Sequence, residues 1–351
     1  MTALLIFLIV LVVTIPIIIF IVGILLGCFV TRRRVSRLKL DFKSRFKQLT
    51  RKLRFNEKNF HQNTVEQIGS GHFSEVYKAT LIKPVDGIHN VSIKVLRDFD
   101  PFDPFQVKEF FDEVENFITI NQHENVLSLL GVYCPSNQNQ QNDQVFRFPG
   151  IVTHLMNEGD AESYLKPVNA GGRGQQITVG AAISLCLQAV DGLSHLHQVK
   201  ILHRDMAARN CLLRRMSNGE LQLKISDYGL ACKGEISKHL YSYTIIQKYR
   251  SKKSIQLAFM WLAPEIYSSE AKDRELFSEK SDIWSLGVTF WEFFTLCQIP
   301  YKQLLKNDTN HSLESIPSSD RILDFLDKKK RLQKPIFCDD NAYGVLLCIS
   351  V

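Results

Sequence analysis

The feature that most restricts how this chain can fold is a run of 28 residues without a charge, from Ala3 to Val30. A helix of that length reaches roughly 42 Å, more than the ~30 Å hydrocarbon core of a bilayer requires. Pro16 and Gly23 are tolerated within such a helix. A secretory signal peptide is the alternative, but it would begin with basic residues and have a shorter apolar stretch of about 7 to 15 residues. We therefore predict a transmembrane helix in residues 1–31.

A strongly basic segment follows this run directly. Twelve lysines and arginines stand between Arg32 and Lys58 against two acids, a net charge of +10 that leaves about −3 for the rest of the chain. Basic residues beside a span favour the cytoplasmic side. We therefore expect a single-pass protein, in the plasma membrane, whose later residues are cytoplasmic. The juxtamembrane segment 32–61 is either a plain stop-transfer anchor or also a contact for anionic lipid.

The remaining composition excludes several classes of protein. Because the basic charge is confined to one short segment, the sequence gives no reason to expect nucleic-acid binding. The eight cysteines are scattered and contain no C-x-x-C pair, so a disulfide framework and a zinc site are both disfavoured. With 351 residues, 45% of them apolar, the chain has room for one large domain or two ordinary ones.

Several short segments carry chemically suggestive residues. Residues 203–210 read His-Arg-Asp-Met-Ala-Ala-Arg-Asn, and residues 227–229 read Asp-Tyr-Gly. Upstream lie a glycine-containing turn at 67–77, an alternating apolar strand at 91–96 with one lysine, and helical apolar spacing over 110–117. Taken singly, these segments are explained by a surface ion cluster, a hairpin and a solvated helix face. Together and in this order they resemble a receptor-type protein tyrosine kinase.

The resemblance implies an α+β architecture, the bilobal protein kinase fold, with a β-rich N-lobe and a helical C-lobe after a single transmembrane helix. The implied kinase domain covers 62–351, divided into an N-lobe at 62–152, a hinge at 153–158 and a C-lobe at 159–351. A complete kinase would continue for about one more helix pair, so we expect the end of the C-lobe to be missing.

The resemblance also implies ATP and Mg²⁺ as cofactors and assigns roles to individual residues. The catalytic set would be Asp205, Lys94, Glu113, Arg209 and Asn210, with Asn210 and Asp227 as metal ligands. Glu115 is the alternative partner for Lys94. Asp282 resembles the aspartate that binds the catalytic-loop backbone. The nucleotide would be bound by Ile68, Gly69, Ser70, Gly71, Val76, Ser92, Lys94, Thr153, His154, Met156 and Leu212.

Two features of the resemblance indicate tyrosine as the acceptor. Ala207 stands where serine/threonine kinases usually carry a lysine, and Arg209 is placed as in tyrosine kinases. The run Trp-Leu-Ala-Pro-Glu at 261–265 resembles their substrate shelf. Between the two segments, Tyr249 is the expected main autophosphorylation site, with Arg204 as the partner of its phosphate. The other candidate sites are Tyr243 and Tyr241.

The expected partners are protein substrates with tyrosine, the membrane, and a second copy of the chain for trans-phosphorylation. Two other possibilities stay open. Ser74 replaces the third glycine of the nucleotide loop, and together with the expected truncation this departure allows a catalytically weak pseudokinase that acts as a scaffold. The chain could also be an inactive fragment of a receptor kinase.

Overall fold

The computed structural model describes residues 48, 50–70, 74–83, 87–97, 103–135, 148–167, 171–233, 258–267, 277–305, 317, 319–335, 338 and 343–344. The predicted membrane span, Gly71 and the three predicted phosphorylation sites Tyr241, Tyr243 and Tyr249 lie outside these residues. The chain divides into two compact units, one of Met1–Arg54 with Asp98–Phe111 and one of Phe55–Arg97 with Asp112–Val351. The architecture and the site described below belong to the second unit.

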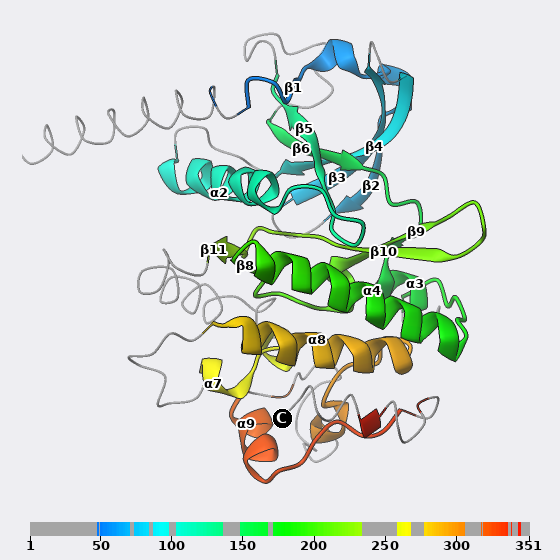
Figure 1. The fold of residues 1–351 in the computed structure, drawn as a ribbon, viewed down its shortest axis with the longest axis vertical. Helices are drawn as coiled ribbons and strands as arrows, with labels where there is room; N and C mark the ends of the chain where they lie inside the picture. The colour runs from blue at the N-terminus through cyan, green and yellow to red at the C-terminus, as the bar shows by residue number, and fades with distance from the viewer. Residues whose placement is uncertain are drawn as a thin grey trace, which may run out of the picture. The chain divides into compact units, whose positions relative to one another are not determined.

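The β-rich part is one six-stranded sheet, in the order β1-β5-β6-β4-β3-β2 (Figure 1). Side chains alternate between the two faces along a strand. On β4, Val91, Ile93 and Val95 are buried in the core of the sheet, so Ser92 and Lys94 lie on the opposite face. The strands are β1 (Arg54–Phe55), β2 (Glu66–Ser70), β3 (Ser74–Lys83), β4 (Gly87–Leu96), β5 (Leu129–Tyr133) and β6 (Gly150–His154).

Helix α2 (Pro104–Ile120) follows β4 in the chain, and its part from Asp112 onward belongs to the second unit. In this part Val114, Phe117 and Ile120 are buried. Their spacing of three residues gives the helix one apolar face.

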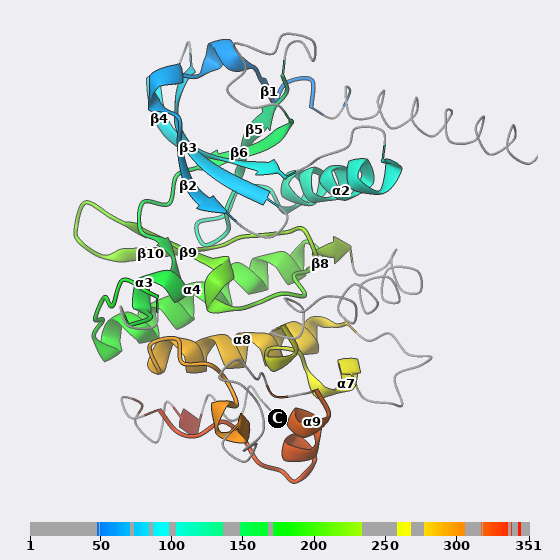
Figure 2. The same ribbon diagram turned by 180° about the vertical axis from the view of Figure 1, so that it is seen from behind.

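The C-lobe is built around two helices that lie side by side in both views, α4 (Val179–Gln198) and α8 (Glu279–Phe294) (Figures 1 and 2). The hydroxyl of Thr178 caps the start of α4 by accepting the Ala181 amide, and a reciprocal capping box of Ser278 and Ser281 begins α8. Every residue of α8 from Trp284 to Phe294 is buried, as expected for a helix that is apolar on most of its surface.

Smaller elements complete this lobe. The β-hairpin of β9 and β10 pairs with β7, and β8 pairs with β11. The strands are β7 (Gly159–Asp160), β8 (Ile201–Leu202), β9 (Cys211–Arg215), β10 (Leu221–Ile225) and β11 (Cys232–Lys233). The remaining α-helices are α3 (Ala161–Leu165), α7 (Pro264–Tyr267) and α9 (Ser319–Asp327). The 3₁₀ turns are η1 (Glu57–Asn59), η2 (Gln62–Thr64), η4 (Ala208–Asn210), η5 (Ala258–Met260) and η7 (Lys302–Leu305).

The α+β fold with a β-sheet N-lobe and a helical C-lobe is thus confirmed. Within the described part of the chain, α4 is long and apolar enough to cross a membrane by length and composition alone. This property is weak support for a span, because α4 packs against β10 and α8 inside the C-lobe.

Candidate active site

A lysine and two carboxylates from distant parts of the sequence meet between the two lobes. The Nζ atom of Lys94 on β4 lies 2.9 Å from Oε1 of Glu113 on α2 and 2.8 Å from Oδ1 of Asp227. Glu115, the alternative partner, instead lies 3.8 Å from Nζ of Lys233. The structure therefore joins the predicted lysine to Glu113 and not to Glu115.

The charges of this group stabilise one another. Burial alone would lower the pKa of Lys94, but the carboxylates of Asp227 and Glu113 outweigh burial and raise this pKa well above its ordinary value. The positive charge of Lys94 in turn lowers the pKa of Asp227 to about 2. Lys94 and Asp227 thus form an ion pair at neutral pH.

The predicted catalytic loop places several donors around Asp205. Arg209 Nη2 donates to its Oδ1 at 2.5 Å, and Asn210 Nδ2 donates to its Oδ2 at 2.8 Å. Asp282, a buried aspartate of α8, anchors the backbone of this loop. Its carboxylate accepts the amide N–H groups of His203 and Arg204, each at 2.8 Å. The Asp205 carboxylate is therefore fixed in position by its own loop.

The two segments that contain Asn210 and Asp227 are joined by the β9–β10 hairpin, which pairs Cys211 with Ile225. At its end, both the amide and the hydroxyl of Ser226 donate to the carbonyl of Asn210, at 2.9 and 3.0 Å. Asp227 itself has a positive φ of 65°, a left-handed conformation that is rare for a non-glycine residue and is often found at functional sites. Sequence reasoning did not find Ser226, since a serine at a strand end carries no signal of its own.

An aromatic stack connects α2 to the catalytic loop. The ring of Tyr228 lies 4.8 Å from that of Phe117 and 5.8 Å from that of His203, edge to face in both cases. Its hydroxyl donates to the carbonyl of Ile225 at 2.6 Å. Tyr228 is fully buried, so this hydrogen bond satisfies a polar group that would otherwise be costly to bury.

The predicted nucleotide-binding residues come from strands of both lobes. Thr153 on β6 is the cross-strand neighbour of Ser92 on β4, and their hydroxyls are 2.8 Å apart. The pair lies on the same face of the sheet as Lys94, two residues farther along β4. Among the remaining described candidates, Met156 is buried while Ile68 and His154 are exposed. Ile68, Gly69 and Ser70 lie on β2, Val76 on β3, His154 at the end of β6, Met156 in the hinge and Leu212 on β9.

Arg204 of the catalytic loop is buried in an unusual state. Only 5% of it is exposed, and its guanidinium stacks over the ring of Phe277 at 5.0 Å. Its Nε and Nη1 atoms have no hydrogen-bond partner among the described residues. A buried guanidinium of this kind favours an anion as its partner.

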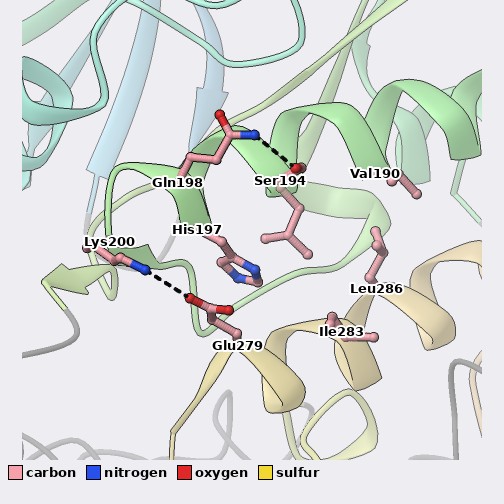
Figure 3. A pocket seen from close by; sticks show the side chains of 9 residues that line it. Val190, Ser194, His197, Gln198, Lys200, Glu279, Ile283 and Leu286 are labelled. Carbon is pink, nitrogen blue, oxygen red and sulfur yellow. Dashed lines mark hydrogen bonds and ion pairs between the residues drawn. The ribbon is translucent and has the colours of Figure 1, made fainter.

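A separate pocket of about 400 Å³ lies between α4 and α8 (Figure 3). Apolar side chains of Val190, Ile283 and Leu286 line it together with His197 and with the exposed pair of Lys200 and Glu279. None of the predicted site residues lines this pocket, so it is distinct from the candidate active site.

The chain is similar to known protein kinases along most of its length. The family model for protein tyrosine and serine/threonine kinases matches residues 62–349. Tyrosine-protein kinase receptor svh-2 of Caenorhabditis elegans is 29% identical over 300 residues, which are 85% of this chain and 23% of that protein. Proto-oncogene tyrosine-protein kinase ROS of Rattus norvegicus is 30% identical over 284 residues, 80% of this chain and 10% of that protein.

A third relative, the tyrosine-protein kinase transforming protein RYK of Avian retrovirus RPL30, is 29% identical over 282 residues, 80% of this chain and 54% of that protein. The chain thus spans about half or less of the length of these curated relatives. The match to the family model, by contrast, covers most of the chain and includes both lobes and all the candidate site residues. The chain belongs to the family of protein tyrosine and serine/threonine kinases.

Proposed function

We propose that the protein is a membrane-anchored tyrosine kinase that transfers the γ-phosphoryl group of ATP to tyrosine side chains of proteins. The observation that carries the proposal is the contact of Lys94 with both Glu113 and Asp227. Phosphoryl transfer depends mainly on positioning and on neutralising charge, and this cluster supplies a fixed cation beside a carboxylate.

The two sequence features that resemble tyrosine kinases, Arg209 and the segment 261–265, are in contact, which supports tyrosine as the phosphoryl acceptor. The guanidinium of Arg209 stacks on the ring of Trp261 at 4.7 Å, so the catalytic loop and the predicted substrate shelf form one surface. The three relatives are also tyrosine-protein kinases by name. We infer that a long phenolic side chain reaches Asp205 across this surface.

The residues divide the work as follows. Lys94, held by Glu113, binds phosphate oxygens, and Asp205 accepts the proton of the attacking tyrosine hydroxyl. Asn210 and Asp227 would hold Mg²⁺, because amide and carboxylate oxygens are the ligands that this ion prefers. Asn210 directs its amide nitrogen to Asp205, which leaves its amide oxygen for the cation. When bound, Mg²⁺ neutralises the charge of the phosphates.

The proposal includes the parts of the chain on either side of the catalytic residues. Residues 1–31 span the membrane once, 32–61 form a basic segment of which the part before β1 contacts anionic lipid, and the kinase domain of 62–351 lies in the cytoplasm beneath the plasma membrane. Two copies phosphorylate each other in trans. The charge-free run and the +10 segment of the sequence support this arrangement.

The full chain in detergent, incubated with ATP and Mg²⁺, tests the proposal by phosphoamino-acid analysis of the chain and of an added tyrosine-containing polymer. We expect phosphotyrosine in both. Phosphoserine or phosphothreonine alone would contradict the choice of acceptor. A folded protein that transfers nothing would instead support the scaffold.

We predict that autophosphorylation occurs mainly at Tyr249. Arg204 is a buried cation with two nitrogen atoms that lack a partner in the described part of the chain, and a phosphate on the activation segment would supply the missing anion. Mass spectrometry of active protein should find this phosphate. Tyr249→Phe should lower the activity severalfold, and Tyr241→Phe, the matched control, should change it less. Phosphate found only at other residues would refute the prediction.

A further inference from the structure

An acidic residue is buried in the middle of the apolar helix α8. Glu292 is 2% exposed and lies between Trp291 and Phe293 in a stretch in which every residue is buried. Charged residues are almost never fully buried unless they have partners. An acid inside an apolar helical run is also the one sequence signal that could have drawn attention to this position.

Glu292 accepts hydrogen bonds from the catalytic loop and from the predicted substrate shelf. Its Oε2 atom accepts the indole Nε1–H of Trp261 at 2.8 Å and the backbone amide of Ala208 at 2.9 Å. Ala208 begins the 3₁₀ turn η4 of the catalytic loop, whereas Trp261 lies 31 residues before Glu292 in the chain. One carboxylate oxygen therefore ties the loop to the substrate shelf.

Both donors are connected through Arg209 to Asp205, the proposed base. The ring of Trp261 lies under the guanidinium of Arg209 at 4.7 Å, and Arg209 donates to Asp205. Arg209 also lies on the turn that begins with Ala208. Two groups therefore set the orientation of Arg209: the backbone of its own turn and the ring of Trp261. Glu292 accepts a hydrogen bond from each of them.

We propose that Glu292 is a positioning residue for phosphoryl transfer, which fixes Arg209 against Asp205 by binding Trp261 and the Ala208 amide at the same time. The inference rests on the proposed function for its kinetic consequence, but the contact itself does not. Glu292 acts on the catalytic base and on the peptide shelf. Its described hydrogen bonds go to Ala208 and Trp261 and not to the Lys94 cluster that would bind the nucleotide.

The protonation of Glu292 gives the contact a measurable signature. Burial raises its pKa to about 7, although the Trp261 and Ala208 donors and the positive charge of Arg209 act in the opposite direction and Glu162 adds to the rise. The charge of Glu292 also adds to the rise in the pKa values of the buried thiols of Cys211 and Cys297. A carboxylate is a stronger acceptor than a carboxylic acid, so the bond to Trp261 should strengthen as the pH rises through about 7.

Two replacements separate positioning from plain packing. Glu292→Gln keeps an oxygen that can accept both bonds, and we expect its kcat to stay within about threefold of the wild type. Glu292→Leu fills a similar volume but leaves the indole N–H and the Ala208 amide without an acceptor. We expect its kcat for a tyrosine peptide to fall at least about tenfold, its peptide KM to rise, and its affinity for ATP to stay unchanged.

A parallel loss of ATP affinity, kcat and thermal stability in both variants would show a merely structural residue and would overturn the proposal. Should Glu292→Leu not fold, Trp261→Phe removes the indole N–H together with the five-membered ring and leaves Glu292 with the Ala208 amide as its described donor. We expect the kcat of Trp261→Phe for a tyrosine peptide to fall while its affinity for ATP stays unchanged, and an unchanged kcat would contradict the proposal.

A readout without catalysis distinguishes this inference from the proposed function. In the full chain labelled with ¹⁵N at its three tryptophans, the indole signal missing from Trp261→Phe identifies Trp261. This signal should titrate with a midpoint near pH 7 in the wild type and should not titrate in Glu292→Gln. Titration without any tyrosine phosphorylation would leave the contact intact and refute the kinase. If tyrosine is phosphorylated but the pH titration of the Trp261 signal is the same in the wild type and in Glu292→Gln, the contact is refuted.

Discussion

The Asp205→Asn variant is expected to lose about 10²- to 10⁴-fold of its rate of phosphoryl transfer to tyrosine, the range that a positioned base contributes. Asparagine has the same shape as aspartate but cannot take a proton from the attacking hydroxyl. Arg209 and Asn210 each donate to one carboxylate oxygen of Asp205. In the variant an amide N–H₂ replaces one of these oxygens, so one hydrogen bond is lost because two donor groups face each other. The measurement is the initial rate of tyrosine phosphorylation at saturating ATP and Mg²⁺.

Two observations must accompany this loss if the base is its cause. The affinity for ATP should be close to that of the wild type, because Asp205 has no contact with Lys94, Glu113 or Asp227 among its described hydrogen bonds. The unfolding midpoint should also stay near the wild-type value, since Asp282 still holds the loop. An Asp205→Asn protein with an undiminished rate would refute the assignment of Asp205 as the base and favour another acceptor.

Local sequence patterns predicted the elements that carry the site. Alternation of apolar residues over 91–96 predicted a strand, and β4 contains this segment. The helical apolar spacing over 110–117 predicted a helix, and α2 covers Pro104–Ile120. These predictions succeeded because the period of two in a strand and of 3.6 in a helix is written into neighbouring residues.

The contacts between elements followed only from the resemblance or were not predicted at all. Lys94 and Asp227 are 133 residues apart, and no local period relates them. The hydroxyl contact of Ser92 with Thr153 depends on the register of β4 against β6. The binding of Glu292 to Trp261 depends on how α8 packs beneath the loop. Register and packing are set by the whole core, so these partners are visible only in three dimensions.

The largest effect on stability is expected from Asp282→Leu. Asp282 is 1% exposed and accepts the amides of His203 and Arg204 and the ring nitrogen Nε2 of His197, which is 3.0 Å away and lines the pocket of Figure 3. Leucine would leave two buried amides without an acceptor, at about 1–3 kcal/mol each. We expect the free energy of unfolding to fall by about 2–5 kcal/mol and tyrosine phosphorylation to be lost, because the loop that carries Asp205 loses its anchor.

Denaturant unfolding of the Asp282→Leu variant measures this loss, with Ile283→Ala as the matched control. Ile283 is the next residue of α8 and is 41% exposed, so its truncation should cost well under the loss at Asp282. Asp282→Asn should fall between the two, since its amide oxygen still accepts one backbone amide while its N–H₂ faces the other. Equal losses for Asp282→Leu and Ile283→Ala would mean that the carboxylate does not anchor the loop. A stable Asp282→Leu protein with full activity would mean that packing alone holds the conformation of His203 and Arg204. Arg204 has a left-handed φ of 67°, which is unfavourable for a non-glycine residue, so we expect its backbone to need the Asp282 carboxylate.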